Sequence, residues 1–343
     1  MGECMSTVKL GVVGLGRLGR NHAANIHYHL PNAELTAICS VAQTELDNVA
    51  EEMKPRYCYT DYREMFKNQE LDGVVIASNS QAHCEMACAA AELGVKNVYI
   101  EKPLGMALDE VEQIRIAVGK SNIRVFQVGY NRRFDASYRA LKKKLEEGYI
   151  GKPILIKMVN RDPASMADFI IKFSPTSGGL VFDMLTHDYD AARWFLNADA
   201  TTAYGLGGVY AYEGLAAVND IDNCGILCKF DNGAMGWFET SRNCSYGYHT
   251  ETEVFGTDGC LRVCVTPTND RVLYLDKQGI HQSTVSWFYE YWEPTFTAEM
   301  KEFVDAIAEQ RAPNAAGLID GYKAVQWALA AKKAVDEEAV VKI

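Results

Sequence analysis

Short apolar segments alternate with longer amphipathic segments over the first 130 residues of the chain. The apolar segments have the length and β-branched content of strands, and they lie at 9–13, 35–39, 74–77, 98–100 and 125–128. The segments between them have helical spacing, at 17–30, 44–53, 82–93 and 108–120. A fully apolar strand such as 74–77 suits a sheet that is covered on both faces. This alternation predicts an α/β fold with a doubly wound parallel sheet.

The pattern changes after a charged helical segment at 138–147, which ends in a turn rich in Gly and leads into a strand at 154–159. From about residue 200, polar turn dipeptides stand between short alternating strands. Asn232-Gly233 and Asp258-Gly259 favour the left-handed conformations of tight hairpins. These signals predict an antiparallel sheet with a meander-like order.

Two amphipathic helices close the chain, near 297–310 and 318–335. The change of pattern divides the chain into two predicted domains. We expect a dinucleotide-binding domain over 1–130 and a second, α+β domain for substrate binding and oligomerisation over 131–343. The last helix is expected to pack back on the first domain.

Composition narrows the function classes. The 343 residues are 48% hydrophobic, which excludes disorder as the main state. With 34 basic and 45 acidic residues the net charge is −11, which disfavours nucleic acid as a partner. No apolar segment approaches the ~20 residues of a membrane span, and no signal-peptide core is present, so we predict a cytoplasmic protein without a membrane partner. The ten cysteines lack metal-ligand spacing, and we predict no metal site.

A G-x-G-x-x-G motif lies where the first predicted strand meets the first predicted helix. Its glycines are Gly14, Gly16 and Gly19. In this context the first glycine permits a tight turn, the second lets the backbone approach a pyrophosphate, and the third lets the helix pack on the strand. The helix N-terminus supplies free N–H groups for the phosphates. A plain glycine-rich turn is the alternative.

The residue that would hold the adenosine ribose is expected about 20 positions further on, at the end of the second strand. Ser40 stands there in place of Asp or Glu. A carboxylate would repel the 2′-phosphate of NADP, whereas a serine would not, but no Arg or Lys adjoins Ser40 to attract that phosphate. These features favour NAD slightly over NADP as the cofactor, and they allow use of both.

Two further motifs carry candidate catalytic residues. Glu101-Lys102-Pro103 follows a predicted strand, at the carboxyl edge of the sheet where ligands bind, and a lysine there can hold a hydroxyl or polarise a carbonyl. Asp183 and His187 are four residues apart in a helix that opens at Gly178-Gly179, so we expect them to share one helix face. A carboxylate beside an imidazole orients it and raises its pKa, which suits a general base. A surface lysine and a histidine on a polar helix face are the plainer alternatives.

Four motifs, taken in this order, resemble those of the Gfo/Idh/MocA oxidoreductase family, and the similarity covers nearly the whole chain. They are the glycine turn, Glu101-Lys102-Pro103, the segment 127–135, and Gly178-Gly179 with Asp183, His187 and Asp188. The segment 245–248 is similar to the inositol 2-dehydrogenase branch, and its alternating Tyr246 and Tyr248 are expected to share one strand face. The resemblance implies a Rossmann domain joined to an α+β domain with a large open-faced, mostly antiparallel sheet, in a dimer or homotetramer.

The resemblance also implies roles for individual residues. The catalytic residues of an NAD(P)-dependent dehydrogenase would be Lys102, Asp183 and His187. His187 would take the proton of the substrate hydroxyl, and Asp183 would adjust the basicity of His187. Lys102 would position the reacting oxygen while a hydride passes to the nicotinamide. The expected substrate-binding residues are Asn131, Arg132, Asn160, Asp162, His187 and Tyr248. The expected cofactor-binding residues are Gly14, Gly16, Arg17, Leu18, Gly19, Ser40, Ser78, Asn79, His83, Glu101 and Lys102.

The implied substrate is a cyclic polyol, myo- or scyllo-inositol, whose secondary hydroxyl is oxidised to a ketone. Departures from the family pattern leave the isomer open. Asn131 stands where inositol dehydrogenases tend to carry Met, and Asn160-Arg161-Asp162-Pro163 where they tend to carry His-Arg-Asn-Pro. A pyranose sugar or sugar derivative is a second substrate class. A transient-redox glycosidase or lyase that keeps its NAD, and a cofactor-sensing regulatory protein, are further alternatives on the same scaffold.

Overall fold

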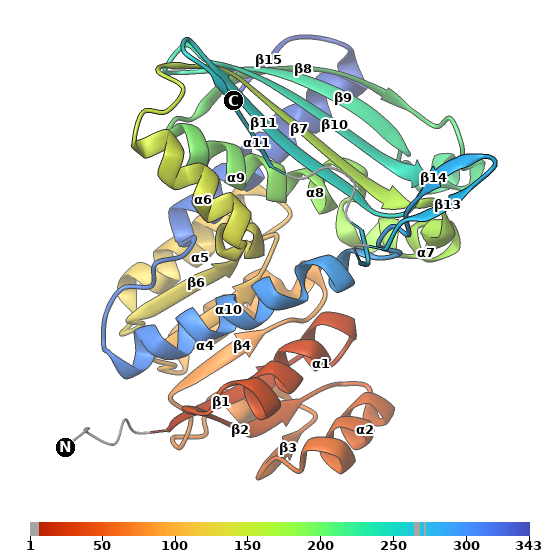
Figure 1. Ribbon diagram of the computed structural model, residues 1–343. Helices are drawn as coiled ribbons and strands as arrows, with labels where there is room; N and C mark the ends of the chain where they lie inside the picture. The colour runs from red at the N-terminus through yellow and green to blue at the C-terminus, as the bar shows by residue number, and fades with distance from the viewer. Residues whose placement is uncertain (1–6, 264–267, 271) are drawn as a thin grey trace. The chain divides into compact units, whose positions relative to one another are not determined.

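The computed structural model describes residues 7–263, 268–270 and 272–343, and Figure 1 shows its helices and strands. The chain divides into two compact units. The first unit holds the described residues up to Phe134 together with Pro294–Val325, and the second holds those of Asp135–Glu293 and Gln326–Ile343. Two long helices, α10 (Phe288–Ala308) and α11 (Leu318–Glu337), therefore contribute residues to both units.

The first unit is built on a six-stranded parallel sheet with the order β3-β2-β1-β4-β5-β6. Its strands are β1 (Val8–Val13), β2 (Ala33–Cys39), β3 (Tyr57–Tyr59), β4 (Gly73–Ile76), β5 (Asn97–Glu101) and β6 (Val125–Gly129). β4 and β5 are buried along their whole length, as in a sheet with both faces covered. This is the strand order of doubly wound folds, which bind ligands where the order reverses, between β1 and β4.

Five helices follow strands of this sheet. They are α1 (Arg17–Ala24), which runs on as a π-helical segment over Asn25–His29, α2 (Gln43–Met53), α3 (Tyr62–Phe66), α4 (His83–Glu92) and α5 (Leu108–Lys120). A later part of the chain completes the core, because Met300, Phe303 and Val304 of α10 lie in one buried cluster with Val12 and Tyr99. The core of the first unit therefore depends on a segment that follows the second unit's sheet in sequence.

The second unit is built on a seven-stranded sheet with the order β12-β11-β7-β10-β9-β8-β15. Its strands are β7 (Pro153–Pro163), β8 (Ala200–Gly208), β9 (Asn223–Phe230), β10 (Met235–Cys244), β11 (His249–Gly256), β12 (Cys260–Val263) and β15 (Val341–Lys342). β7 and β10 pair in parallel, and the other neighbouring strands pair antiparallel. A separate two-stranded ribbon joins β13 (Tyr274–Asp276) and β14 (Gly279–His281).

Burial alternates along this sheet, as expected when only one face is covered. In β9, for example, Ile226 and Phe230 are buried, whereas Leu227 is exposed. The α-helices that lie wholly within the unit are α6 (Ala136–Glu146), α7 (Ala167–Ser177), α8 (Gly179–Asp183) and α9 (Leu185–Leu196). Figure 1 shows α6, α8 and α9 on one side of the sheet. Trp327 of α11 stacks on Tyr189 of α9 within this covered layer.

The sequence-based expectations hold for the first unit, where all five predicted strands and all four predicted helices are present. In the second unit, the predicted hairpins join β9 to β10 and β11 to β12. The sheet is not a simple meander, however, because β7 lies between β10 and β11. Among the residues that the structure describes, no helix is both long enough and apolar enough to cross a membrane.

Candidate active site

The glycine turn has the backbone geometry that its sequence predicts. Gly14 has a positive φ of 84°, and a Cβ there would lie 2.6 Å from the backbone N of Ser78. A Cβ at Gly19 would lie 1.7 Å from the carbonyl oxygen of Gly14, so helix and turn meet closely. A Cβ at Gly16, in contrast, would meet no described atom within 4 Å. Two of the glycines are therefore required by packing, and the third borders open space.

Helix α1 begins directly after this open space. Its N-cap residue is Gly16, which has no side chain to satisfy the N–H groups of the first turn. These N–H groups and the helix dipole favour an anionic ligand at this position. Arg17 is exposed and Leu18 is half-buried in the same turn. The turn thus fits the pyrophosphate of a dinucleotide such as NAD, with room for close approach at Gly16.

The loops after β4 and β5 are joined by a buried histidine. His83 is 1% exposed, and its Nδ1 lies 2.7 Å from the carbonyl oxygen of Pro103, while its Nε2 lies 3.3 Å from that of Ser78. Burial lowers the pKa of His83 below its ordinary value. The side chain of Asn79 accepts from the backbone N of Ala82 and caps the short helix that precedes α4. His83 and Asn79 therefore shape the loops at the carboxyl edge of the sheet.

A buried polar network stands directly before Lys102. Glu101 Oε1 lies 2.6 Å from His22 Nε2 of α1, and both side chains are almost fully buried. The Tyr99 hydroxyl lies 3.1 Å from Glu101 Oε1 and 3.0 Å from Glu299 Oε2 of α10. Burial by itself would raise the pKa of Glu101, but the hydrogen bond and charge of His22, with the charge of Lys102, lower it below its ordinary value. An ionised Glu101 therefore links β5 to the helix of the glycine turn.

Lys102 is half-buried, and its backbone N donates to Glu101 Oε2 at 3.2 Å. The Lys102–Pro103 peptide bond is cis. Two of the expected substrate-binding residues, Asn131 and Arg132, follow β6 in the same unit and are both buried. Asn131 Nδ2 donates to Thr295 Oγ1 of α10 at 3.0 Å. Lys102, Asn131 and Arg132 thus all follow the carboxyl ends of two neighbouring strands, β5 and β6.

Asp183 and His187 belong to the second unit, and they do not lie in one uninterrupted helix as expected. Asp183 is the last residue of α8, and His187 lies in the first turn of α9, which begins at Leu185. The break falls at Met184, whose carbonyl oxygen lies 3.4 Å from the side-chain amide of Asn160. A side chain from β7 thus contacts the backbone where one helix ends. Because Lys102 lies in the other unit, its meeting with His187 remains a prediction.

Arg242 of β10 lies between two residues that the sequence analysis assigns to the site. Its Nη1 donates to Asp162 at 2.5 Å, and its Nη2 donates to Asp183 at 2.8 Å. The Arg242 side chain is 3% exposed, against 19% for each carboxylate. Burial alone would lower the pKa of Arg242, but Asp183 and Asp162 raise it above its ordinary value. The arginine is therefore a permanent cation that fixes both carboxylates.

Asn160 adds a second connection between β7 and the helix that carries His187. Its Nδ2 donates to Asp188 Oδ2 at 3.1 Å, and both residues are buried. Asp188 directly follows His187 in α9. The α8–α9 segment is thus held from β7 on both sides of Met184, by Asn160 directly and by Asp162 through Arg242. This arrangement fixes the helical turn from which His187 projects.

The two tyrosines of segment 245–248 do not share a strand face. They lie in the turn between β10 and β11, where Gly247 has a φ of 104° that interrupts the strand alternation. Tyr246 is 43% exposed, whereas Tyr248 is 3% exposed and its hydroxyl accepts from Trp292 Nε1 at 2.9 Å. The expectation of a shared face is wrong because it extended the strand into a glycine turn.

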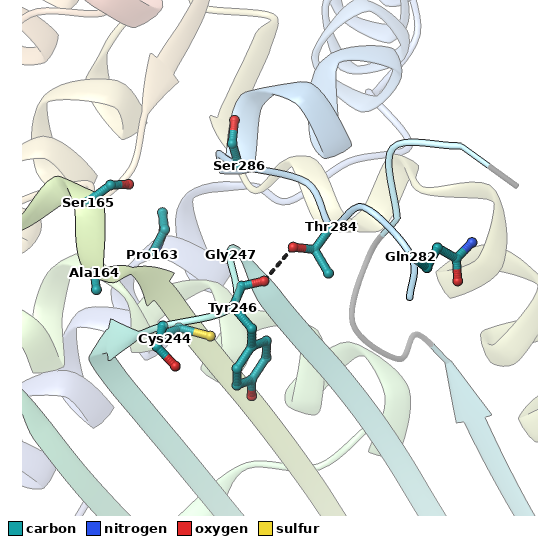
Figure 2. Close-up of a pocket in the computed structure, with 10 residues that line it drawn as sticks. Pro163, Ala164, Ser165, Cys244, Tyr246, Gly247, Gln282, Thr284 and Ser286 are labelled. Atoms are coloured by element: carbon teal, nitrogen blue, oxygen red, sulfur yellow. Dashed lines mark hydrogen bonds between the residues drawn. The ribbon is translucent and has the colours of Figure 1, made fainter. Parts of the chain in front are cut away.

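A hollow of about 420 Å³ opens beside this turn. Figure 2 shows that it lies among three segments, one after β7, one between β10 and β11, and one before α10. Its lining is rich in hydroxyl groups, which come from Ser165, Ser245, Tyr246, Thr284 and Ser286. The hollow begins where the strands that carry Asp162 and Arg242 end, because Pro163 and Cys244 line it too.

Comparisons with known proteins place these observations in a family. The model of an oxidoreductase family with an NAD-binding Rossmann fold matches residues 8–130, and the model of the GFO/IDH/MocA C-terminal domain matches residues 138–262. Myo-inositol 2-dehydrogenase of Thermotoga maritima is 32% identical over 340 residues, which are 98% of both chains. The scyllo-inositol 2-dehydrogenase (NAD(+)) of Bacillus subtilis is 31% identical over 89% of this chain and 88% of its own.

A solved structure agrees with these relatives. The scyllo-inositol dehydrogenase from Lactobacillus casei, with bound NAD(H) and scyllo-inositol, superposes with a TM-score of 0.93 at 33% identity, covering 98% of this chain and 99% of that one. Fold, glycine turn and relatives together define an NAD-binding oxidoreductase with a Rossmann sheet. The chain belongs to the GFO/IDH/MocA oxidoreductase family. The family resemblance and the fold class predicted from the sequence are confirmed.

Two residues that the structure brings into the site were not found from the sequence. His22 lies on the inner face of α1 and carries no motif of its own. Arg242 does have a signal, since strand alternation places it on the same inward face as Phe238 and Thr240. A charged residue at an inward strand position requires a buried partner. That argument would have predicted an ion pair at Arg242 without naming its partners.

We expect His22→Leu to destabilise the protein by about 3 kcal/mol, because it leaves the Glu101 carboxylate buried without its partner. The folded-state pKa of Glu101 is lowered, so the pair stabilises the fold above the ordinary carboxyl pKa, and this stabilisation is lost as the pH falls through the lowered value. Urea unfolding measured between neutral and acidic pH checks both statements. His27→Leu, an exposed position on the next turn, serves as control and should leave the unfolding midpoint unchanged.

We expect Arg242→Met to lower the free energy of unfolding by about 3 kcal/mol, because two carboxylates would then face each other without a cation. Arg242→Lys should recover part of this loss, since a lysine keeps the charge but cannot bond both carboxylates in the same planar geometry. Urea unfolding followed by circular dichroism measures the change. Arg115→Met removes an exposed arginine from α5 as control. An Arg242→Met protein as stable as the control would contradict the role of Arg242.

Proposed function

We propose that the protein oxidises a secondary hydroxyl of a cyclic polyol of the inositol class to the ketone, with NAD as the acceptor. The relatives named above support the substrate class, since myo- and scyllo-inositol dehydrogenases match over nearly the whole chain. The structural observation that carries the proposal is the anchored α8–α9 segment. Asp183 and His187 lie on it, and Arg242 and Asn160 hold it to the sheet.

In this proposal His187 is the general base that takes the proton from the substrate hydroxyl. Asp183 tunes that imidazole, and the ionic bond to Arg242 keeps the Asp183 carboxylate in one orientation. Lys102 holds the reacting oxygen with its ammonium group, and the Glu101 network before it fixes the strand end from which it projects. The chemistry that bound NAD supplies is acceptance of a hydride from the carbinol carbon.

The proposal also assigns residues to cofactor binding and to substrate binding. We propose that the glycine turn and the loops after β2, β4 and β5 bind NAD, which the open space at Gly16 and the uncapped start of α1 support. We propose that Asn131, Arg132, Asn160, Asp162 and Tyr248 recognise the substrate. A site that bonds particular hydroxyls rejects other isomers, because a mismatch leaves buried polar groups unpaired. The buried state of Arg132 and Tyr248 agrees with recognition of this kind.

A substrate panel tests the proposal. The purified protein is given myo-, scyllo- and chiro-inositol and several aldoses, each with NAD and with NADP, and nicotinamide reduction is followed by absorbance at neutral and alkaline pH. We expect reduction of NAD with at least one inositol isomer. A nitrophenyl glycoside is tested as well, and release of nitrophenol from it without net NADH would assign the transient-redox alternative instead. No reduction with any polyol, in a sample shown to bind NAD, would count against the proposed reaction.

His187→Ala tests the assignment of the base. We expect the turnover number to fall by roughly 10²–10⁴-fold, which is the usual contribution of a positioned acid–base group. Binding of NAD, measured by calorimetry, should be unchanged, because the glycine turn lies in the other unit. His29→Ala changes an exposed histidine of the first unit and should leave turnover unchanged. Wild-type turnover in His187→Ala would remove His187 from the mechanism.

We further propose that the protein is a cytoplasmic homo-oligomer, up to a tetramer, that associates through the open face of the second sheet. Large apolar side chains are exposed there on neighbouring strands: Leu227, Met235, Trp237 and Phe255. Trp237 pairs with Leu227 across β10 and β9, and Met235 and Phe255 are both in register with Leu155 of β7. Exposed apolar groups that adjoin in this way favour an interface. The eight described cysteines are free, as in a reducing compartment.

Trp237→Glu tests the interface. We expect wild-type protein to elute from size exclusion with light scattering at a multiple of the chain mass. A carboxylate at the centre of the apolar face should shift the protein to smaller species, because it would be buried without a partner. Ile116→Glu, which changes an exposed apolar residue of α5, is the matched control and should keep the wild-type mass. An unchanged mass for Trp237→Glu would place the interface elsewhere.

A further inference from the structure

The end of β2 lacks the acidic residue that dinucleotide folds use to hold the adenosine ribose. Ser40 occupies that position and is buried. The structure nevertheless brings a carboxylate to the same place. Glu45, in the first turn of α2, accepts a hydrogen bond from the Ser40 hydroxyl, with 2.9 Å between Oγ and Oε2. A negative group thus stands at the end of β2, supplied by the helix that follows it.

The Ser40 hydroxyl orients this carboxylate. Its oxygen accepts from the backbone N of Ala42 at 3.2 Å, which leaves its single proton for Glu45. The Glu45 side chain is half-buried, so it is neither fully solvated nor enclosed. Within the described part of the chain, Ser40 is its only hydrogen-bonding side-chain partner. The remaining lone pairs of the carboxylate are therefore available to a hydroxyl donor from a ligand.

We propose that Glu45 recognises the adenosine ribose of NAD by accepting a hydrogen bond from it, and that it excludes NADP. An ionised carboxylate accepts from a ribose 2′-hydroxyl and repels a 2′-phosphate at the same position. Ser40 acts as a positioning residue, since it orients Glu45. The inference depends on the dinucleotide site of the first unit and not on the identity of the polyol.

The charges around the end of β2 agree with this selectivity. Residues 39–53 contain Glu45, Asp47, Glu51 and Glu52 but no Lys or Arg. Arg20 of α1 is paired with an acid of this segment, since its Nη2 lies 2.6 Å from Glu52 Oε2. A 2′-phosphate would therefore enter a region that carries excess negative charge. Selectivity for NAD follows from the absence of a cation on this segment together with the oriented Glu45.

Binding measurements without any substrate test the proposal. Dissociation constants for NAD and NADP are determined by calorimetry for wild-type protein and Glu45→Gln. We expect wild-type protein to prefer NAD by at least about tenfold, and Glu45→Gln to lose that preference, because a hydrogen bond to a charged group is worth about tenfold or more in affinity. Asp47→Asn removes the same charge from an exposed position of the same helix, and it should keep the wild-type ratio.

A rescue variant tests whether a carboxylate at the strand end can replace the one on Glu45. Ser40→Asp combined with Glu45→Gln returns the carboxylate to the strand end, and we expect it to restore the preference for NAD. Thermal unfolding of each variant confirms that the protein remains folded during the titrations. A wild-type preference for NADP, or a ratio that Glu45→Gln leaves unchanged, would overturn the proposal. So would an equal change in Asp47→Asn, which would indicate a general charge effect. None of these outcomes bears on which polyol the protein oxidises.

Discussion

A charge buried inside a protein needs a hydrogen-bonding or oppositely charged partner beside it, and both units of this protein meet that constraint next to a proposed catalytic residue. In the first unit the buried charge is Glu101, which is hydrogen-bonded to His22. In the second it is Arg242, matched by Asp162 and Asp183. An unpaired buried charge costs several kcal/mol, so these pairs persist and define the orientation of the groups they include. The residues that stabilise each unit are therefore also those that hold its chemistry in place.

The parallel sheet of the first unit and most of its helices could be predicted from the sequence, because local signals determine them, whereas the α10 segment that completes its core could not. Strand and helix periods differ, and a glycine turn at Gly14 requires a backbone that other residues rarely adopt. β3 and α3 could not be predicted in this way, since three and five residues are too few to show a period. In the second unit the hairpins follow from their turn dipeptides. No local sequence pattern indicates that β7 pairs with β10, because parallel pairing joins segments far apart in sequence.

The same distinction explains the site. Lys102 could be proposed from the sequence because it follows a strand at the carboxyl edge, and the glycines because their role is local. His22 and Glu101 are 79 positions apart, and Arg242 and Asp183 are 59 apart, so no spacing rule connects them. The end of β2 shows that an expected residue can be missing from its position while the expected chemical group is still present nearby. Ser40 breaks the expected pattern, yet Glu45 returns a carboxylate to that strand end through the helix.

Asn160 and Asp162, the expected departures from the inositol dehydrogenase pattern, acquire a physical meaning from their partners. Asn160 donates to Asp188, and Asp162 accepts from Arg242. Replacing Asp162 by asparagine would remove one of the two carboxylates that balance Arg242. Replacing Asn160 by histidine would change the donor that meets Asp188 and the backbone at Met184. Each polar residue and its partner therefore act as a unit, because changing one alone leaves a buried group unsatisfied. We therefore propose that substrate discrimination changes through matched sets of residues that orient the helix of His187, as well as through groups that touch the substrate.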